Sequence, residues 1–465
     1  MSLNNRPIPE LLSELSTVPL HEKVERIQAL YERVAFSPSG MMYSMQRFAD
    51  GEIRPFRPSD FDGAVFINPS VGKLDIDGPW DYLHGENSIT ASGIYLAAQA
   101  YRIQVEDTPA AREQAERAFH SLELIFEMGV NAGKPGWMNK PYGFRPSNQT
   151  SPDQYNDACW GLFTYHKVAS SARQRRIEEM IVAFADYWRG VDYTLSYFGK
   201  AWNLREETGY GNATTMLIQT LANRFTGDPA YLRDAKWFRD HQTWMRSSTA
   251  LNWLERIETR LRETGQLEAF GSATFPWVTP LLEPGEALFW ESAILCKFVA
   301  VAAEILHEVQ PDLLDDRLPT IMEQWWRQGQ YSIGEDALPY YWIAADFRRG
   351  TWRPLPATKP VPREQWPFGD PFFANVSHIR WFEPLARSMV TSVITHHHAP
   401  TIADEALQQA RHLLEVVDAT RLLWLFDPDG KQLLPEIAYY GHCLSSEMPA
   451  SFLATYWRGR RDGLW

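Results

Sequence analysis

Two kinds of helical segment alternate along this chain, and the alternation constrains the fold more than any other feature of the sequence. Segments of the first kind have apolar residues at three- and four-residue spacing and a charged opposite face, as surface helices do. They cover residues 21–36, 110–129, 170–190, 228–245 and 401–420. Segments of the second kind are apolar nearly all round, so we expect them to be buried on every side. They cover residues 87–103, 152–169, 211–225, 288–306, 378–394 and 440–457.

The period of the alternation distinguishes between two architectures built from helix pairs. The two kinds of segment recur at intervals of roughly 60 to 85 residues, whereas open solenoids repeat at about 34 to 47 residues. The longer interval leaves room for loops rich in Gly, Pro and Trp before each buried helix. The pattern predicts an all-α fold, an (α/α)6 barrel or toroid of helical hairpins with long aromatic-rich loops. We expect this single domain to span residues 1–465.

One linking segment carries a resemblance to a known superfamily. The stretch TLANRFTGDPAYLRDAKWF, residues 220–238, joins a buried helix to an amphipathic one through a Thr-Gly-Asp turn. In this stretch and in its alternating helices, the chain from about Trp80 onward resembles the six-hairpin glycosidase superfamily. The resemblance implies six inner and six outer helices. It also implies a carbohydrate substrate and an active site at the inner-helix N-terminal ends, in a funnel walled by long loops.

Charge and apolar pattern exclude several classes of partner. The formal net charge of −13 disfavours nucleic acid and anionic membranes, because both bind clustered Lys and Arg. The N-terminal residues lack the basic and apolar stretches of a signal peptide. The longest apolar run, AILCKFVAVAAEIL, is interrupted by Lys297 and Glu304 and is too short to span a membrane. We therefore expect a cytoplasmic protein without a membrane or nucleic-acid partner.

The sequence offers no convincing metal or cofactor motif. The cysteines Cys159, Cys296 and Cys443 lie far apart in predicted helices and form no CxxC pattern, so buried free thiols are expected. The run His396–His398 falls at a predicted helix C-terminus, where His is favourable against the helix dipole. Three consecutive His side chains point in different directions, which suits chelation poorly. No P-loop, dinucleotide fingerprint or GxSxG motif occurs, and we expect no metal and no cofactor.

The stretch SPDQ marks the start of the second buried helix. Ser151 at the N-cap, Pro152 at the first helical position and Gln154 at the third predict a capping box. The helix dipole then favours the negative charge of Asp153. This gives the presence of an aspartate at this position a purely structural explanation. The functional interpretation rests on position, because the N-terminus of an inner helix would point into the funnel. A helix start suits a carboxylate that acts as base or nucleophile.

Polar residues recur at the starts of the other inner helices, and we expect them to converge. Polar helix starts are also common as caps, so the recurrence is the informative part. The recurring residues are His84 and Glu86 before the first buried helix, Asp157 one turn after Asp153, Glu291 behind Trp290, the set Arg205, Tyr210 and Asn212, and the pair His378 and Arg380.

Glycoside hydrolysis needs two carboxylates that flank the scissile bond. Asp153 with Glu86 is the preferred pair, because adjacent inner helices would bring them together. Glu291 or Asp157 would substitute for either. The toroidal unsaturated glucuronyl hydrolases are implied to use an aspartate at an inner-helix start. The resulting hypothesis is a glycoside hydrolase that cleaves a neutral or uronate-containing oligosaccharide.

Aromatic residues make up 13% of the chain, and many tryptophans fall in predicted loops. Their flat faces pack well against the C–H faces of sugars. The tryptophans expected to line the funnel are Trp80, Trp137, Trp202 and Trp290. Arg205 or Arg380 would bind a uronate carboxylate, because the guanidinium fork matches that group. The alternative is that long loops over a helical core need large side chains as anchors.

Three other functions stay open on the same toroid. A polysaccharide lyase would use Tyr210 or a His as base, with Asn212 or an Arg neutralising the uronate carboxylate. A sugar epimerase or isomerase would use paired His, such as His84 and His378. A non-catalytic helical scaffold would bind a peptide or a glycan. Fold alone does not decide among them.

Residues 330–371 interrupt the helical pattern with Pro, Gly and Trp. We expect a loop insertion over the active-site funnel, with a short strand in PYYWIAA, residues 339–345. A surface loop without a role is the alternative, because long ordered loops are often but not always functional.

Overall fold

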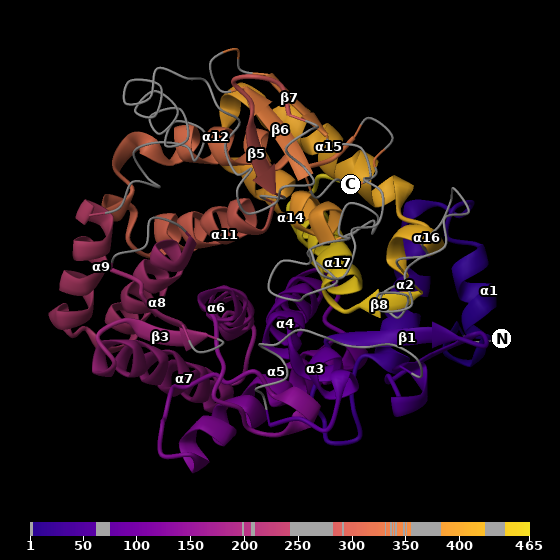
Figure 1. Ribbon diagram of the computed structural model, residues 1–465, viewed down its shortest axis with the longest axis horizontal. Coiled ribbons are helices and arrows are strands. Elements are labelled where there is room, and N and C mark those ends of the chain that lie inside the picture. Colours follow the sequence, from indigo (N-terminus) through magenta and orange to yellow (C-terminus); the bar gives the residue numbers. More distant parts are fainter. Residues whose placement is uncertain are drawn as a thin grey trace.

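The computed structural model describes residues 3–61, 75–197, 200–205, 210–241, 282–290, 293–330, 332–334, 337, 339, 342–346, 349, 351–354, 383–423 and 442–465. Within these ranges six helices form an inner ring in which each packs against the next (Figure 1). They are α4 (Ser88–Val105), α6 (Pro152–His166), α8 (Tyr210–Thr226), α11 (Ala293–Val309), α14 (Glu383–His398) and α17 (Glu447–Arg461). Helix α17 packs against α4 and so closes the ring.

A second layer of six helices surrounds this ring in the part of the chain that the structure describes (Figure 1). They are α2 (Leu20–Val34), α5 (Pro109–Asn131), α7 (Ser171–Gly190), α9 (Pro229–His241), α12 (Leu318–Gln330) and α15 (Ala403–Val416). Each of α5, α7, α9, α12 and α15 packs on the inner helix that precedes it, and α2 packs on α17. The (α/α)6 toroid predicted from the helical alternation is therefore confirmed. Helix α12, which was not among the predicted helices, completes the outer layer.

Two glycines set the spacing between α4 and α6. A methyl group on Gly93 would lie 2.2 Å from the backbone oxygen of Asp157, and one on Gly161 would lie 2.3 Å from the backbone oxygen of Gly93. Any larger side chain at either position would push the helices apart, because a packed interior has no room to absorb it. The start of α6 is therefore held at close range to the start of α4.

The Thr-Gly-Asp turn between α8 and α9 has the geometry that its residues predict. Gly227 follows the last residue of α8 with φ +72°, a conformation that favours glycine. The Asp228 carboxylate accepts a hydrogen bond of 2.8 Å from the backbone N–H of Ala230 in the first turn of α9. Two consecutive helices are thus reversed in direction with almost no intervening chain.

Short strands make three small antiparallel sheets among the described residues. The sheets are β2–β1–β8, β3–β4 and β5–β6–β7. The strands are β1 (Met45–Ala49), β2 (Glu52–Arg54), β3 (Thr194–Tyr197), β4 (Lys200–Asn203), β5 (Ala287–Trp290), β6 (Trp342–Asp346), β7 (Thr351–Pro354) and β8 (Cys443–Ser445). Met45 pairs with Ser445, so a strand near the start of the chain is joined to the segment that leads into α17.

Short helices complete the description. The α-helices are α1 (Ile8–Ser13), α3 (Pro79–Gly85) and α16 (Ala419–Leu422). The 3-10 helices are η1 (Leu3–Asn5), η2 (Pro58–Phe61), η4 (Tyr142–Phe144), η6 (Pro311–Leu313), η7 (Asp315–Arg317) and η10 (Pro400–Ile402). Helix α3 packs against η4, and both lie close to the start of α4 in the chain or in space.

Some boundary predictions are wrong, and for a common reason. Cys443 lies in strand β8 and not in a helix, and the residues before α11 form strand β5. Both segments are as apolar as the helices they precede, so periodicity cannot separate them. The three cysteines are buried and free, as predicted. Strand β6 confirms the strand predicted in PYYWIAA, whereas residues 355–371 of the expected insertion lie outside the described residues.

The connections between helices differ greatly in length at the two ends of the inner ring. Those that lead into α6, α8, α11, α14 and α17 cover residues 132–151, 191–209, 242–292, 331–382 and 417–446. Those that leave α4, α6, α8, α11 and α14 cover only residues 106–108, 167–170, 227–228, 310–317 and 399–402. The N-terminal ends of the inner helices therefore meet the long segments of the chain, where binding and catalytic residues concentrate. No helix among the described residues is long and apolar enough to cross a membrane.

Candidate functional site

The start of α6 differs in one detail from its prediction. Ser151 is the N-cap and Pro152 the first helical residue, as predicted, but the Ser151 side chain makes no capping hydrogen bond. Gln154 points away from Ser151 and donates to the backbone oxygen of Glu86 at 2.5 Å. The capping box is therefore wrong, because Gln154 is used to tie the start of α6 to the residues that precede α4.

Asp153 is the carboxylate that this arrangement leaves without a partner. It lies in the first turn of α6 and is half-buried. Its carboxylate makes no hydrogen bond and no ion pair with any described residue. The hydrogen bond from the next residue, Gln154, to Glu86 places the start of α6 beside the start of α4. A half-buried carboxylate without a protein partner is poorly explained by folding, since partial desolvation costs free energy.

Glu86 lies next to this point and is already engaged by the protein. Lys140 donates to Oε1 of Glu86, and the hydroxyl of Tyr142 donates to Oε2 at 2.7 Å. The Lys140 side chain is almost fully buried, while 14% of the Glu86 side chain is exposed. Lys140 and Tyr142 together fix the position of the Glu86 carboxylate.

His84 lies two residues before Glu86, near the end of α3. Its Nε2 is 3.1 Å from the backbone oxygen of Phe56. A carbonyl oxygen only accepts, so Nε2 carries the proton and the lone pair is on Nδ1. Burial lowers the pKa of His84, although the nearby Asp81 and the hydrogen bond to Phe56 act to raise it. The ring stacks on Phe144 with a centroid distance of 6.0 Å, so a neutral imidazole is held in a fixed orientation.

A buried network of charges lies below this surface, in the N-terminal half of the inner ring. We call Asp157, Lys297, Glu383, Arg387 and Glu447 the N-terminal charge cluster. The ammonium of Lys297 is 3.1 Å from Asp157 and 3.0 Å from Glu447. The Arg387 guanidinium is 3.0 Å from Glu447 and 2.7 Å from Glu383. Four inner helices, α6, α11, α14 and α17, contribute to it, so the cluster joins them across the interior of the ring.

The protonation of this cluster follows from its composition. An uncompensated buried charge is costly, and Asp157 is the least compensated carboxyl group, because Lys297 is its only cationic partner among the described residues and is shared with Glu447. Burial raises the pKa of Asp157 to about 7, in spite of Lys297. Burial acts in the same sense on Glu447, but Arg387 and Lys297 outweigh it and hold its pKa at about 2. Burial would lower the pKa of Lys297, yet Asp157 and Glu447 raise it. Asp157 is therefore the group that carries the proton.

This assignment predicts a pH dependence of stability that Asp157→Asn removes. The folded pKa of Asp157, about 7, lies above its ordinary value of 3.8. The folded state then binds the proton more tightly, so this group stabilises most below about pH 4, and the contribution is lost as pH rises through 7. The difference in unfolding free energy between wild type and Asp157→Asn should fall by up to about 1.4 kcal/mol per pH unit in this window. Urea denaturation at pH 5, 6, 7 and 8 measures it, and a constant difference would contradict the assignment.

Other predicted site residues lie where their side chains are already packed. Trp80 is half-buried, and its ring lies 6.1 Å from that of Phe61. Trp137 is buried and packs edge-on against Tyr187 at 5.2 Å. Arg205 stacks its guanidinium on aromatic rings of the α7–α9 region, 4.4 Å from that of Trp237. Each of these three side chains thus packs against other parts of the protein, and its role in substrate binding stays a prediction.

The remaining predicted residues are described in part or not at all. Asn212 is fully buried in the first turn of α8. Trp202 lies in β4, Tyr210 begins α8 and Trp290 ends β5, and only the backbone is described for these three. Glu291, His378 and Arg380 lie outside the described residues. The hydrogen bond from Gln154 to Glu86 brings the starts of α4 and α6 together, whereas convergence of the predicted site residues stays a prediction.

The described residues give no sign of a metal centre. Within these ranges no group of three His, Cys, Asp or Glu side chains is arranged to hold a metal ion. His397 and His398, in the run at the C-terminus of α14, each face a carboxylate instead.

Comparisons with known proteins add little to this geometry. No protein-family model and no curated protein matches the chain. A D-mannose isomerase structure is similar with a TM-score of 0.49 at 12% identity, over 96% of this chain and 97% of that one. A cellobiose 2-epimerase from Spirochaeta thermophila DSM 6192 is similar with a TM-score of 0.40 at 14% identity, over 81% and 86%. The site must therefore be interpreted from its own residues.

Proposed function

We propose that this protein is a carbohydrate-active enzyme, a glycoside hydrolase whose site lies at the N-terminal ends of the inner helices. The observation that carries the proposal is Asp153, a half-buried carboxylate at an inner-helix start that no described residue engages. The carboxylates around it, Glu86 and Asp157, are held by hydrogen bonds or ion pairs. The long connections of the chain enter the inner ring at this same end, as expected for a substrate site.

The chemistry assigned to this site is hydrolysis with two carboxylates. Asp153 is suited to act as base or nucleophile, since the positive end of the α6 dipole supports its negative charge. Glu86 is the second carboxylate, because it is anchored next to the start of α6 and its side chain is 14% exposed. Lys140 and Tyr142 act as positioning residues that hold Glu86 in place. Neutral and uronate-containing oligosaccharides are both candidate substrates.

Asp153→Asn tests the proposal directly. We expect turnover of an oligosaccharide substrate to fall about 100-fold, the usual loss when a group that transfers a proton is removed. The melting temperature should hardly change, because the Asp153 carboxylate has no described partner to lose. Reducing ends and ultraviolet absorbance are followed together on neutral and uronate-containing oligosaccharides, and thermal melts are recorded on the same samples. Asp404→Asn is the matched control, since Asp404 is exposed in the first turn of the outer helix α15.

Two results would overturn the assignment. If activity per folded molecule is intact while stability drops by about 1 kcal/mol, Asp153 only supports the helix start. If wild type releases no reducing ends from any oligosaccharide, hydrolysis is not the reaction. An unsaturated product that absorbs in the ultraviolet would identify a lyase instead.

A second reaction class is favoured by one observation, the state of His84. A neutral imidazole with its lone pair on Nδ1, held beside Glu86, is suited to take a proton from carbon next to a sugar carbonyl. That step belongs to epimerases and isomerases, which leave no new reducing end. Reducing mono- and disaccharides incubated in deuterium oxide discriminate the two classes. Deuterium at the carbon next to the carbonyl would assign epimerisation or isomerisation, and its absence together with new reducing ends would assign hydrolysis.

A further inference from the structure

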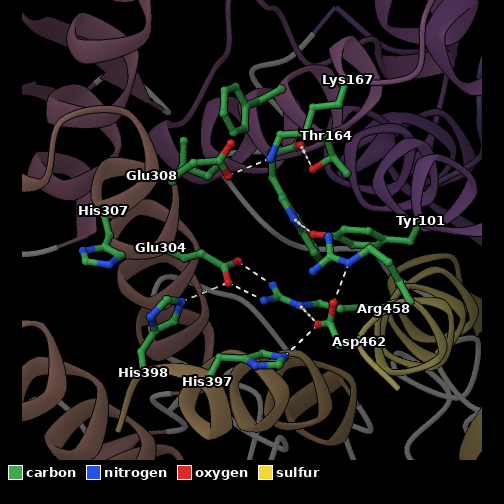
Figure 2. Close-up of a pocket in the computed structure, with 14 residues that line it drawn as sticks. Tyr101, Thr164, Lys167, Glu304, His307, Glu308, His397, His398, Arg458 and Asp462 are labelled. Carbon is green, nitrogen blue, oxygen red and sulfur yellow. Dashed lines mark hydrogen bonds and ion pairs between the residues drawn. The ribbon is translucent and has the colours of Figure 1, made fainter. Parts of the chain in front are cut away.

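A cavity of about 310 Å³ opens at the C-terminal ends of the inner helices, whereas Asp153 lies at an N-terminal end. Figure 2 shows the residues that line this cavity. Its walls come from the C-terminal parts of α4, α6, α11, α14 and α17. We call it the C-terminal pocket. Its size falls at the lower limit of the range for sites that bind small molecules. None of its lining residues belongs to the site proposed for catalysis.

The acidic groups of the pocket are already neutralised by basic neighbours. Both oxygens of Glu304 accept from the Arg458 guanidinium, and His398 lies 3.3 Å from the same carboxylate (Figure 2). Asp462 accepts from Arg461 at 2.6 Å and faces His397 at 2.7 Å. Glu308, the third acidic group of the lining, is ion-paired with Lys167 at 2.6 Å. All three carboxylates are therefore paired with basic side chains.

Spare hydrogen-bond donors remain on the same wall. Arg461 uses only Nε on Asp462, and its two terminal nitrogens bind no described residue. Its guanidinium is held 4.8 Å from the ring of Tyr101, so its orientation is restricted. The hydroxyl of Tyr101 accepts from the indole N–H of Trp160 at 3.2 Å, which leaves its own proton free to donate. Arg461 and Tyr101 thus present pre-oriented donors without matching acceptors.

Apolar surface adjoins these donors. Phe163 and Ile305 line the pocket and are nearly buried, and the indole of Trp160 lies beside Tyr101. A bare inorganic anion would leave this surface unused. A small organic molecule with an anionic group at one end would use both the donors and the apolar wall.

We propose that the C-terminal pocket binds a small organic oxyanion, a metabolite that carries a phosphate or a carboxylate group. The anionic group contacts the terminal nitrogens of Arg461 and the hydroxyl of Tyr101, because a guanidinium fork matches the geometry of either oxyanion. The rest of the ligand lies against Phe163 and Ile305. The C-terminal ends of the surrounding helices oppose an anion. Lys167 and Arg458 are already paired with Glu308 and Glu304, so the attraction for the anionic group comes from the terminal nitrogens of Arg461.

Binding measurements on the full-length protein test this proposal separately from the catalytic one. Isothermal titration calorimetry is carried out with glucose 6-phosphate, glucuronate and inorganic phosphate as probes. We expect one of the two sugar compounds to bind to wild type, and Arg461→Gln to weaken it by about tenfold or more, since a charge-assisted contact is lost. Arg460→Gln is the matched control, because Arg460 is the exposed neighbour on the same turn of α17 and does not line the pocket. Asp153→Asn should bind as wild type does.

The outcomes are decisive. Binding of a sugar compound that is lost in Arg461→Gln and kept in Arg460→Gln supports the proposal, and the preferred probe distinguishes phosphate from carboxylate. No binding of any probe at millimolar concentration, equal binding in Arg461→Gln, or binding of inorganic phosphate alone would overturn it. Should Arg461→Gln fail to fold, Arg461→Lys keeps the charge and removes the fork, and Tyr101→Phe removes one donor. Each of these should still weaken binding.

Discussion

Lys297→Met is expected to lower the free energy of unfolding by about 3–5 kcal/mol at pH 8, because it leaves two carboxylates buried without their shared cation. The Lys297 ammonium is fully buried between Asp157 and Glu447. Arg387 continues to neutralise Glu447 in the variant. The uncompensated charge therefore falls on Asp157, which has no other basic partner among the described residues.

The loss should depend on pH in a defined direction. Asp157 can accept a proton, since burial already raises its pKa to about 7, and removing Lys297 should raise that pKa further. The deficit of Lys297→Met is therefore expected to shrink at pH 5, where Asp157 is neutral. Urea denaturation at pH 5 and pH 8 measures this, with Lys236→Met in the outer helix α9 as the control. Lys236 is exposed, and its variant should stay within about 0.5 kcal/mol of wild type. A deficit below about 1 kcal/mol at pH 8 would show that the cluster is not a coupled unit.

Arg458→Met is expected to cost about 3 kcal/mol at neutral pH, the lower end for a broken buried pair, because 15% of the Glu304 side chain is exposed. Burial would raise the pKa of Glu304, but Arg458 and then His398 outweigh it and hold the pKa far below the ordinary value. The stabilisation is thus present above the ordinary pKa of 4.5 and is lost as pH falls. The deficit should therefore persist from pH 8 to pH 5 and shrink only in more acidic solution.

Arg460→Met provides the comparison for this second variant. Arg460 lies two residues further along α17 and is exposed, so the substitution removes the same charge without breaking the pair with Glu304. Chemical denaturation from pH 3 to pH 8 gives both curves. If the two arginine variants lose equal stability, net charge and not the Glu304 pair is responsible.

The inner ring was predictable because its signal is long and redundant. A helix that packs on all sides, such as α4, must be apolar at nearly every position, so no single substitution hides it. The outer helix α12 was missed, although Ile321, Met322, Trp325 and Trp326 are buried. Its buried residues have the same helical spacing as those of α9, which is equally long, so a local signal for α12 was present in the sequence.

The charge cluster was not predictable from the same pattern. Lys297 and Glu304 were visible only as two charges that interrupt an apolar stretch. In the structure Lys297 joins the N-terminal charge cluster and Glu304 joins the C-terminal pocket. A charged residue inside an all-apolar helix does signal a buried partner. The partners Asp157 and Arg458 are supplied by other helices, and no local rule connects them.

The capping prediction failed for a similar reason. Local sequence allows Gln154 to fold back to the N-cap or to reach outward, and the two differ little in energy. Contact with Glu86 and Asn87 on the neighbouring helix start decides the matter. Local preference predicted where α6 begins, and tertiary contact determined what its first polar side chains do.

Closure of the ring by α17 has a consequence for how the molecule is assembled as it is synthesised. Helix α17 packs on both α14 and α4, the Tyr31 hydroxyl donates to the backbone oxygen of Ser446, and β8 pairs with β1. Until these late residues leave the ribosome, the first five inner helices form an open arc with two uncovered apolar flanks. Such contacts between distant parts of a chain form slowly, and exposed flanks favour aggregation. Closure of the ring is thus expected only once α17 has been synthesised, and chaperone demand should be concentrated before that point.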